Sequence, residues 1–463
     1  MTSDHPVVRL GDYVDACLGK MLDVQKNRGQ LQPYLGNSNV RWGSFDLENL
    51  AVMRFEDHEE ERYGIRDGDL IVCEGGEPGR CAIWRGDTPM KIQKALHRVR
   101  TTDGLDNYFL YYWFLRAGST GELEPFFTGT TIKHLTGKAL AELRVPLPPI
   151  AVQREVAKVL RSLDAKIDVN RRINQTLEAM AQAIFKSWFV DFDPVKAKIA
   201  AIQEGRDPLR AAMSAISGKP DAELDALPPE AFAPLAATAA LFPDAMEASA
   251  LGEIPKGWSV ARIQDVVEGV YDGPHATPPE ATEGAVFLGI RNMTGTTLDM
   301  RDIRHIAEAD WAQWTRRIEP RAGDIVFSYE ATLGYFALLP SGLRCCLGRR
   351  LALVRPRTDL GFGSFWFHQF VASPFQRFLE KHTIPGATVN RIALKDFPSF
   401  PVLRPTTGVQ SAYCARVDLM WSLIHANQSQ SERLATLRDT LLPKLLSGEL
   451  SVSRVNDEVA HAL

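Results

Sequence analysis

The sequence contains one long segment twice. Residues 151–190 align with residues 408–447 without a gap, at a constant offset of 257 positions. A looser match continues upstream, where RDGDLIVCEGGEPG (66–79) resembles RAGDIVFSYEATLG (321–334). A repeat of this length predicts a duplicated chain, in which each copy forms a domain of about 145 residues followed by a long helix.

The repeated segments have the spacing of long amphipathic helices. Apolar residues recur at alternating steps of four and three, a heptad pattern that predicts a coiled-coil seam. Each apolar stripe needs a partner helix, and the obvious partner is the other copy. Both stripes become polar at their centre. Buried polar side chains at such positions fix the register of paired helices, and the alternative is that these side chains are exposed because the stripe turns away from the partner helix. Polar centres coincide in parallel and in antiparallel pairs, so the pattern leaves the orientation open. The predicted seam consists of Leu160, Leu163, Ile167, Asn170, Asn174, Leu177, Val417, Met420, Ile424, Asn427, Ser431 and Leu434.

Short β-branched runs such as DLIVC and DIVFS, bounded by Gly, Pro and Asp, predict strands in both domains. Aromatic-rich runs such as NYFLYYWFLRAG suit helices packed on a sheet. An Ala- and Pro-rich segment between the copies has helical fragments and no clear core, and it is expected to be a surface connector. The predicted fold class is α+β, with mixed α/β domains at 1–150 and 256–403, long helices at 151–193 and 404–450, the connector at 194–255 and a tail at 451–463.

Composition limits the class of protein. No apolar run reaches the ~18–20 residues that span a bilayer, and the first residues lack the pattern of a signal peptide. The six cysteines show no C-x-x-C spacing, which favours a reduced cytoplasmic protein. The formal net charge is −4, and the connector alone, with 5 basic and 9 acidic residues, has a net charge of −4. The remainder is therefore neutral, which is only weak support for a nucleic-acid partner.

Signatures of catalysis are missing from the sequence. It contains no G-x-x-x-x-G-K-[ST], H-E-x-x-H, G-x-S-x-G or N-P-P-[YFW] motif. Asp191 and Asp193 are paired carboxylates at a helix end, but no His or Cys lies beside them. The second copy reads KLLSGELSV at this place and has no such pair of aspartates. Helix capping is a better interpretation than metal binding or acid–base work, so we expect no metal and no catalytic residue on this chain.

Several short motifs follow one another along the chain. A domain ends in Pro-Pro before a helix that opens I-x-V-Q-x-x-V, and WFVDFDPVKAK closes that helix. LFPDAMEASALGEIPKGW (241–258) leads into the second domain, and LLPKLLSGEL (441–450) ends the second helix. This order resembles that of the specificity subunits of type I DNA restriction–modification enzymes, and the resemblance covers nearly the full chain.

This resemblance implies a non-catalytic DNA-recognition subunit. Each domain would be a target-recognition domain that reads one half of a split, asymmetric double-stranded DNA target, and the two helices would pair antiparallel. Two methyltransferase subunits and the translocase-nuclease subunits would be the partners. S-adenosylmethionine, ATP and Mg would be cofactors of those partners, with none on this chain.

Basic and amide residues in both domains are candidates for DNA contacts. Lys94 aligns with Arg349 and Arg100 with Arg355, and cations shared by two readers of different bases suit phosphate contacts. A solvated charged face is the alternative for each residue. The predicted set is Lys91, Gln93, Lys94, Arg98, Arg100, Arg291, Asn292, Arg349, Arg350, Arg355 and Arg357, of which Gln93, Arg291 and Asn292 suit base edges.

One further repeat is local. GTTIKHLTG (129–137) and GATVNRIAL (386–394) share a Gly-x-Thr-Ile/Val core. Because residues common to both domains are poor candidates for specificity, these stretches are expected to be scaffold or backbone contacts. Two other functions stay open: a coiled-coil scaffold with two protein-binding domains, and a single-chain DNA methyltransferase or nuclease with an unrecognised site.

Overall fold

A computed structural model describes residues 5–23, 27–48, 50–300, 303–357, 363–386, 389–452, 454, 455 and 459. The chain divides into two compact units. Unit 1 comprises Met1–Arg171 and Gln428–Leu463, and unit 2 comprises Arg172–Asn427. The long helices α4 (Ile150–Phe185) and α13 (Thr407–Ser447) each contribute residues to both units.

Unit 1 contains a three-layered domain. A four-stranded sheet, in the order β2-β11-β8-β9, lies between helix α2 (Asn107–Thr120) and a second four-stranded sheet, in the order β6-β3-β10-β7. The strands are β2 (Val14–Leu18), β3 (Gln30–Leu35), β6 (Ala51–Phe55), β7 (Gly64–Ile65), β8 (Leu70–Cys73), β9 (Cys81–Ile83), β10 (Met90–Ile92) and β11 (Leu96–Thr101), with a separate pair of β1 (Val7–Arg9) and β12 (Arg144–Pro146).

The alternation of side chains along β8 explains these layers. Leu70 and Val72 pack in one core with Phe109 of α2, whereas Ile71 and Cys73 pack in the core beneath the second sheet. Because successive side chains of a strand point to opposite faces, a continuous apolar run is what a strand buried on both faces requires.

Unit 2 repeats the same layers. A sheet in the order β16-β22-β19-β20 lies between the helices α11 (Gly363–Val371) and α12 (Ser373–Lys381) and a smaller sheet in the order β18-β17-β21. The strands are β16 (Val267–Asp272), β17 (Ala285–Leu288), β18 (Arg304–Ile306), β19 (Ile325–Ser328), β20 (Phe336–Leu338), β21 (Cys345–Leu347) and β22 (Leu351–Pro356), with β15 (Ser259–Arg262) paired to β23 (Pro401–Arg404). The central sheets share one strand order, and the predicted internal duplication is confirmed.

The two long helices run antiparallel within each unit. In unit 1, Asn170 is buried and its Nδ2 donates to Gln430 Oε1 at 2.9 Å and to Ser431 Oγ at 3.3 Å. In unit 2, Asn427 Nδ2 donates to Asn174 Oδ1 at 2.8 Å. The polar centres of the two stripes therefore meet each other, which supports the register interpretation over the exposed one.

The apolar seam residues are buried around these polar contacts. Most are fully buried, while Ile167, Leu177 and Met420 are partly buried against the cores. The fully buried members are Leu160, Leu163, Val417, Ile424 and Leu434.

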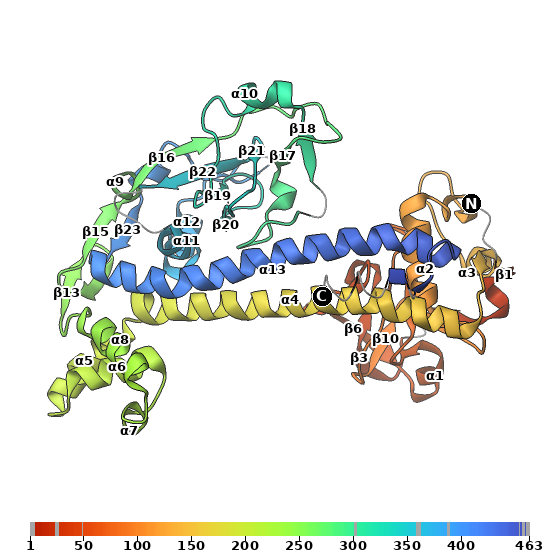
Figure 1. The fold of residues 1–463 in the computed structure, drawn as a ribbon, viewed down its shortest axis with the longest axis horizontal. Helices are drawn as coiled ribbons and strands as arrows, with labels where there is room; N and C mark the ends of the chain where they lie inside the picture. The colour runs from red at the N-terminus through yellow and green to blue at the C-terminus, as the bar shows by residue number, and fades with distance from the viewer. Residues whose placement is uncertain are drawn as a thin grey trace. The chain divides into compact units, whose positions relative to one another are not determined.

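The connector forms a small helical module in unit 2 (Figure 1), made of α5 (Asp193–Gln203), α6 (Pro208–Ser217), α7 (Asp221–Leu224) and α8 (Pro229–Ala240). The expectation that it lacks a core is wrong, because Ala212, Met213, Leu224, Leu235 and Ala239 are buried together. Small alanine side chains let short helices approach closely enough to enclose a core of few residues. A hairpin of β13 (Met246–Ser249) and β14 (Gly252–Pro255) follows.

The paired carboxylates at the start of this module have structural roles. Asp191 forms an ion pair with Lys186, and Asp193 is the first residue of α5. A negative charge in the first turn of a helix is stabilising, so the position of Asp193 agrees with the capping interpretation.

Candidate nucleic-acid interface

Two of the candidate DNA contacts in unit 1 are buried. Lys91 is 1% exposed and forms an ion pair with Glu60. Arg98 is 3% exposed and donates to Asp15 Oδ2 at 2.8 Å and to backbone carbonyls. Because each side chain is enclosed and already paired with a carboxylate, the geometry contradicts a phosphate contact for both.

The aligned pair of Arg100 and Arg355 forms the same structural contact in each unit. Arg355 donates from Nε and Nη2 to the two carboxylate oxygens of Asp324, at 2.8 and 2.7 Å, and Arg100 does the same to Asp69, at 2.7 and 2.9 Å. The hydrogen bonds to Asp324 raise the pKa of Arg355. Arg355 is buried, so its predicted phosphate contact is corrected to a buried bidentate ion pair, while Arg100 stays about one-fifth exposed.

Asn292 holds a turn together and is not placed to read bases. Its Oδ1 accepts from Gly289 N at 2.9 Å and its Nδ2 donates to Asp299 O at 3.0 Å, while the side chain is 3% exposed. Asn39 makes the same two bonds in unit 1, to Gly36 N and Asp46 O. Arg291, which precedes Asn292 on this turn, is exposed.

Four turns of unit 1 meet at one edge of the domain, at residues 36–39, 74–80, 93–95 and 128–134. Backbone hydrogen bonds join them in sequence: Gln93 N donates to Leu35 O at 3.0 Å, Glu74 N to Ala95 O at 2.8 Å, and Leu135 N to Glu74 O at 2.7 Å. We call this surface the turn edge of unit 1.

Unit 2 has an equivalent turn edge at residues 289–292, 328–335, 348–350 and 384–391, of which 387 and 388 lie outside the described residues. Gly348 N donates to Leu288 O at 2.7 Å, Tyr329 N to Arg350 O at 3.2 Å, and Ile392 N to Tyr329 O at 2.8 Å. These bonds match those of unit 1 one for one.

Residues 128–134, which contain the first Gly-x-Thr stretch, form the outermost turn in unit 1, and the described residues around Gly386 and Val389 lie at the matching place in unit 2. Thr128 and His134 exchange two backbone hydrogen bonds of 2.8 Å across this turn. A Cβ on Gly129 would lie 2.3 Å from Ile132 O, and one on Gly386 would lie 2.1 Å from Val389 O. Only glycine fits such an approach, which explains why both copies keep it. The role of Thr388 lies outside the described residues.

The turn edges carry most of the remaining candidates. Lys94 and Arg349 are exposed, and Gln93 and Arg350 are half-buried. Within the described part of the chain, the side chains of these four residues make no hydrogen bond or ion pair. Arg357, at the end of β22, is half-buried and lies off this edge.

Sequence reasoning missed three polar residues on these edges. Glu74 and His134 line a pocket of about 390 Å³ in unit 1, together with Gln93 and Lys94. Arg391 takes the position of His134 in unit 2, where it bridges Ile384. The available signal was that these residues differ between the copies inside stretches that otherwise match.

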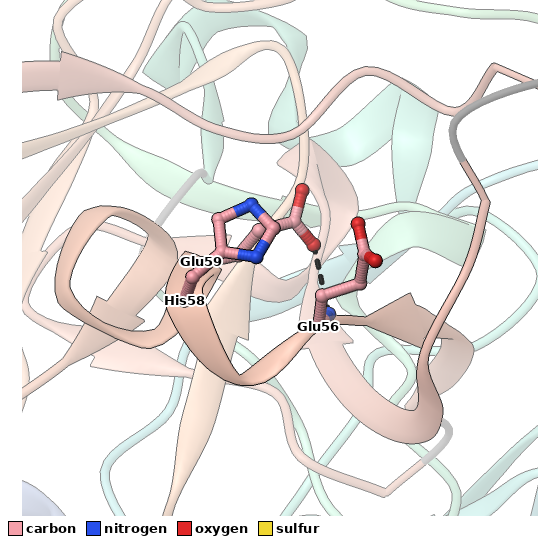
Figure 2. A group of neighbouring side chains, drawn as sticks. All are labelled: Glu56, His58 and Glu59. Atoms are coloured by element: carbon pink, nitrogen blue, oxygen red, sulfur yellow. Dashed lines mark hydrogen bonds between the residues drawn. The ribbon is translucent and has the colours of Figure 1, made fainter.

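One group of side chains in unit 1 has the composition of a metal site. Ligand atoms of Glu56, His58 and Glu59 lie within 4.8 Å of one another (Figure 2). Glu59, however, pairs with Lys20 and accepts from Glu56 N at 2.9 Å. Burial alone raises the pKa of Glu59, but the hydrogen bonds from Lys20 and Glu56 outweigh it and leave that pKa lowered. This carboxylate already has its cation, so the cluster is better explained as an ion-paired turn.

None of the helices in the described part of the chain combines the length and apolarity of a membrane crossing.

Comparison with known proteins gives one consistent match. Residues 7–179 match the family described as type I restriction modification DNA specificity domain. The type I restriction enzyme HindI specificity subunit of Haemophilus influenzae is 27% identical over 69% of this chain and 72% of its own length. The MjaIX specificity subunit of Methanocaldococcus jannaschii is 24% identical over 84% of this chain and 79% of its own. The solved S subunit of a type I restriction-modification system from M. genitalium has a TM-score of 0.49 and 15% identity, over 96% of this chain and 99% of that one.

Proposed function

Because this chain is a relative of the type I restriction enzyme specificity subunits and carries their DNA specificity domain, we propose that it recognises a bipartite, asymmetric DNA target. One observation carries the proposal. The two units build the same turn edge from the same backbone hydrogen bonds, yet present different side chains on it. A conserved scaffold with divergent surface residues is what two readers of different half-sites require.

The cations of the turn edges support contact with DNA phosphates. Lys94 and Arg349 occupy the same position in the two units, and neither is held by a carboxylate within the described chain. Phosphate contacts position a protein on the duplex without carrying sequence information. A cation common to both readers suits that task, and the residues around it are left to read bases.

The helices supply the separation between the half-sites in this proposal. α4 and α13 each continue from one unit into the other, and each unit holds their antiparallel pairing with polar contacts at the centre. A helical connection between two readers sets the spacing of half-sites geometrically. The target would then be two short sequences separated by a fixed number of unspecified base pairs.

The chemistry of the complex is assigned to partner subunits. The relatives are named as subunits of restriction enzymes, and this sequence carries no recognised catalytic motif. We assign methyl transfer with S-adenosylmethionine to two methyltransferase subunits scaffolded by this chain, and ATP hydrolysis and Mg-dependent cleavage to translocase-nuclease subunits. A DNA-free scaffold and a self-sufficient methyltransferase or nuclease are the competing functions.

The adenine methylation pattern of host DNA tests the proposal. The chain is co-expressed with the methyltransferase encoded beside it, and methylated positions are mapped by sequencing. We expect one split motif that requires this chain. An assembled complex that neither methylates nor binds DNA would favour the scaffold function, and methylation by this chain alone would favour the single-chain enzyme.

A further inference from the structure

The pocket on the turn edge of unit 1 has the chemistry of a base-reading site. It has a volume of about 390 Å³, and Glu74, Gln93 and Lys94 contribute to its lining. Glu74 N donates a hydrogen bond to Ala95 O, so the carboxylate of Glu74 and the amide of Gln93 lie on adjacent turns. Among the described residues, neither side chain has a hydrogen-bonding partner.

Glu74 restricts which group the pocket accepts. An ionised carboxylate only accepts hydrogen bonds, and phosphates repel it. The donors that DNA offers in the major groove are the amino groups of adenine N6 and cytosine N4. A carboxylate beside Lys94 is therefore compatible with bound DNA when it faces one of these amino groups. Gln93 can then pair with adenine, or with a neighbouring base.

Unit 2 has the opposite chemistry at the same place. The position of Glu74 is taken by Tyr329, which is buried and whose hydroxyl donates to Arg349 O at 2.8 Å. The surrounding turns carry Arg349, Arg350 and Arg391. Guanidinium groups only donate, and their specific partners in the major groove are guanine O6 and N7.

We propose that Glu74 and Gln93 read an amino-bearing base, adenine or cytosine, in the half-site of unit 1, while Arg350 and Arg391 read guanine in the half-site of unit 2. This inference rests on the proposed function and adds to it the residues that set specificity. Glu74 and Arg350 are then base readers, and Lys94 and Arg349 are the shared phosphate anchors.

The test compares target motifs of single variants in the full chain, each co-expressed with the methyltransferase. The variants are Glu74→Gln, Gln93→Ala and Arg350→Ala, and Glu61→Gln is the matched control because it removes an exposed carboxylate of unit 1 outside the turn edge. Methylation of every sequence context is quantified by sequencing. Thermal melting of each purified complex verifies that the variant is folded.

We expect Glu74→Gln and Gln93→Ala to lose roughly ten- to a hundredfold of the preference at one base pair in the same half-site. Arg350→Ala is expected to relax a guanine in the other half-site, and the control keeps the original motif. Folded variants that retain the wild-type motif at both half-sites overturn the inference and leave the bipartite function standing. The inference also fails when Glu74→Gln and Arg350→Ala alter the same half-site. Absence of any motif with the wild-type chain counts against the proposed function itself.

Discussion

Replacing Arg355 by alanine separates a buried structural ion pair from a DNA contact. Arg355 is 10% exposed at its side chain and Asp324 is 1% exposed, and two hydrogen bonds of 2.8 and 2.7 Å join them. Asp324 also accepts from Arg321 N, which closes the turn before β19. In the Arg355→Ala variant this carboxylate stays buried without its cation.

The magnitude follows from that burial. Removing one partner of a buried ion pair costs about 3–5 kcal/mol, because the remaining charge is desolvated and uncompensated. Every 1.4 kcal/mol changes an equilibrium tenfold, so the opening equilibrium of this region should rise by about two to four orders of magnitude. The equivalent Arg100 is more exposed, and solvent screens the charge of Asp69 after Arg100→Ala, so a smaller loss is expected there.

Amide hydrogen exchange of the full chain resolves these effects by unit. We expect faster exchange in β19 and β22 of unit 2 for Arg355→Ala, with unit 1 as the internal reference. Arg349→Ala, six residues earlier and exposed, serves as the matched control and should leave exchange unchanged. Normal exchange in Arg355→Ala, combined with weaker DNA binding, would refute the structural role and restore the phosphate contact.

Three further predictions concern the turn edge, the helices and acid stability. Lys94→Ala should weaken binding to all DNA sequences alike and reduce the slope of log affinity against log salt by about one, as measured in a salt titration, whereas a changed target sequence would argue for base reading. Deleting one heptad from both helices should change the number of base pairs between the half-sites or abolish binding, and methylation mapping that finds the original spacing would exclude a ruler. Burial lowers the pKa of His368 to about 4. The unfolded chain therefore binds a proton at this imidazole more tightly than the folded chain does, so the free energy of unfolding of unit 2 should fall by about 3 kcal/mol as the pH falls from 6.5 to 4. Chemical denaturation at several pH values measures this loss, which should be absent in His368→Gln.

The sequence was sufficient for the duplication, the two long helices and central strands such as β8 and β19, because each leaves a local apolar pattern. The seam residues Leu160 and Val417 are apolar at a spacing that only a paired helix explains, and both are buried. The core of the connector was not predictable in this way. Its helices are short, and alanine gives little contrast between a buried and an exposed face.

The fate of a charged side chain depends on partners that lie far away in the sequence. Arg98 is neutralised by Asp15, 83 positions earlier, and Lys91 by Glu60, 31 positions earlier. Lys91 lies between the buried residues Met90 and Ile92 of a strand, so alternation places it on the opposite face. Nothing in the local pattern indicates that this second face is also covered.

Shared identity between the two copies does not by itself distinguish a site from a scaffold. Arg100 aligns with Arg355 and Lys94 aligns with Arg349, so both positions keep a cation, but the first pair binds carboxylates and the second is exposed. Burial separates them: Arg100 and Arg355 hold the turns before β8 and β19 through Asp69 and Asp324, whereas the side chains that differ between the units stand on the turn edges. Because backbone hydrogen bonds fix the turn edges, an exposed side chain that differs between the units, such as Arg391, can be replaced without loss of those bonds. The chain is therefore built so that the chemistry of one turn edge can change while the fold and the other turn edge stay as they are.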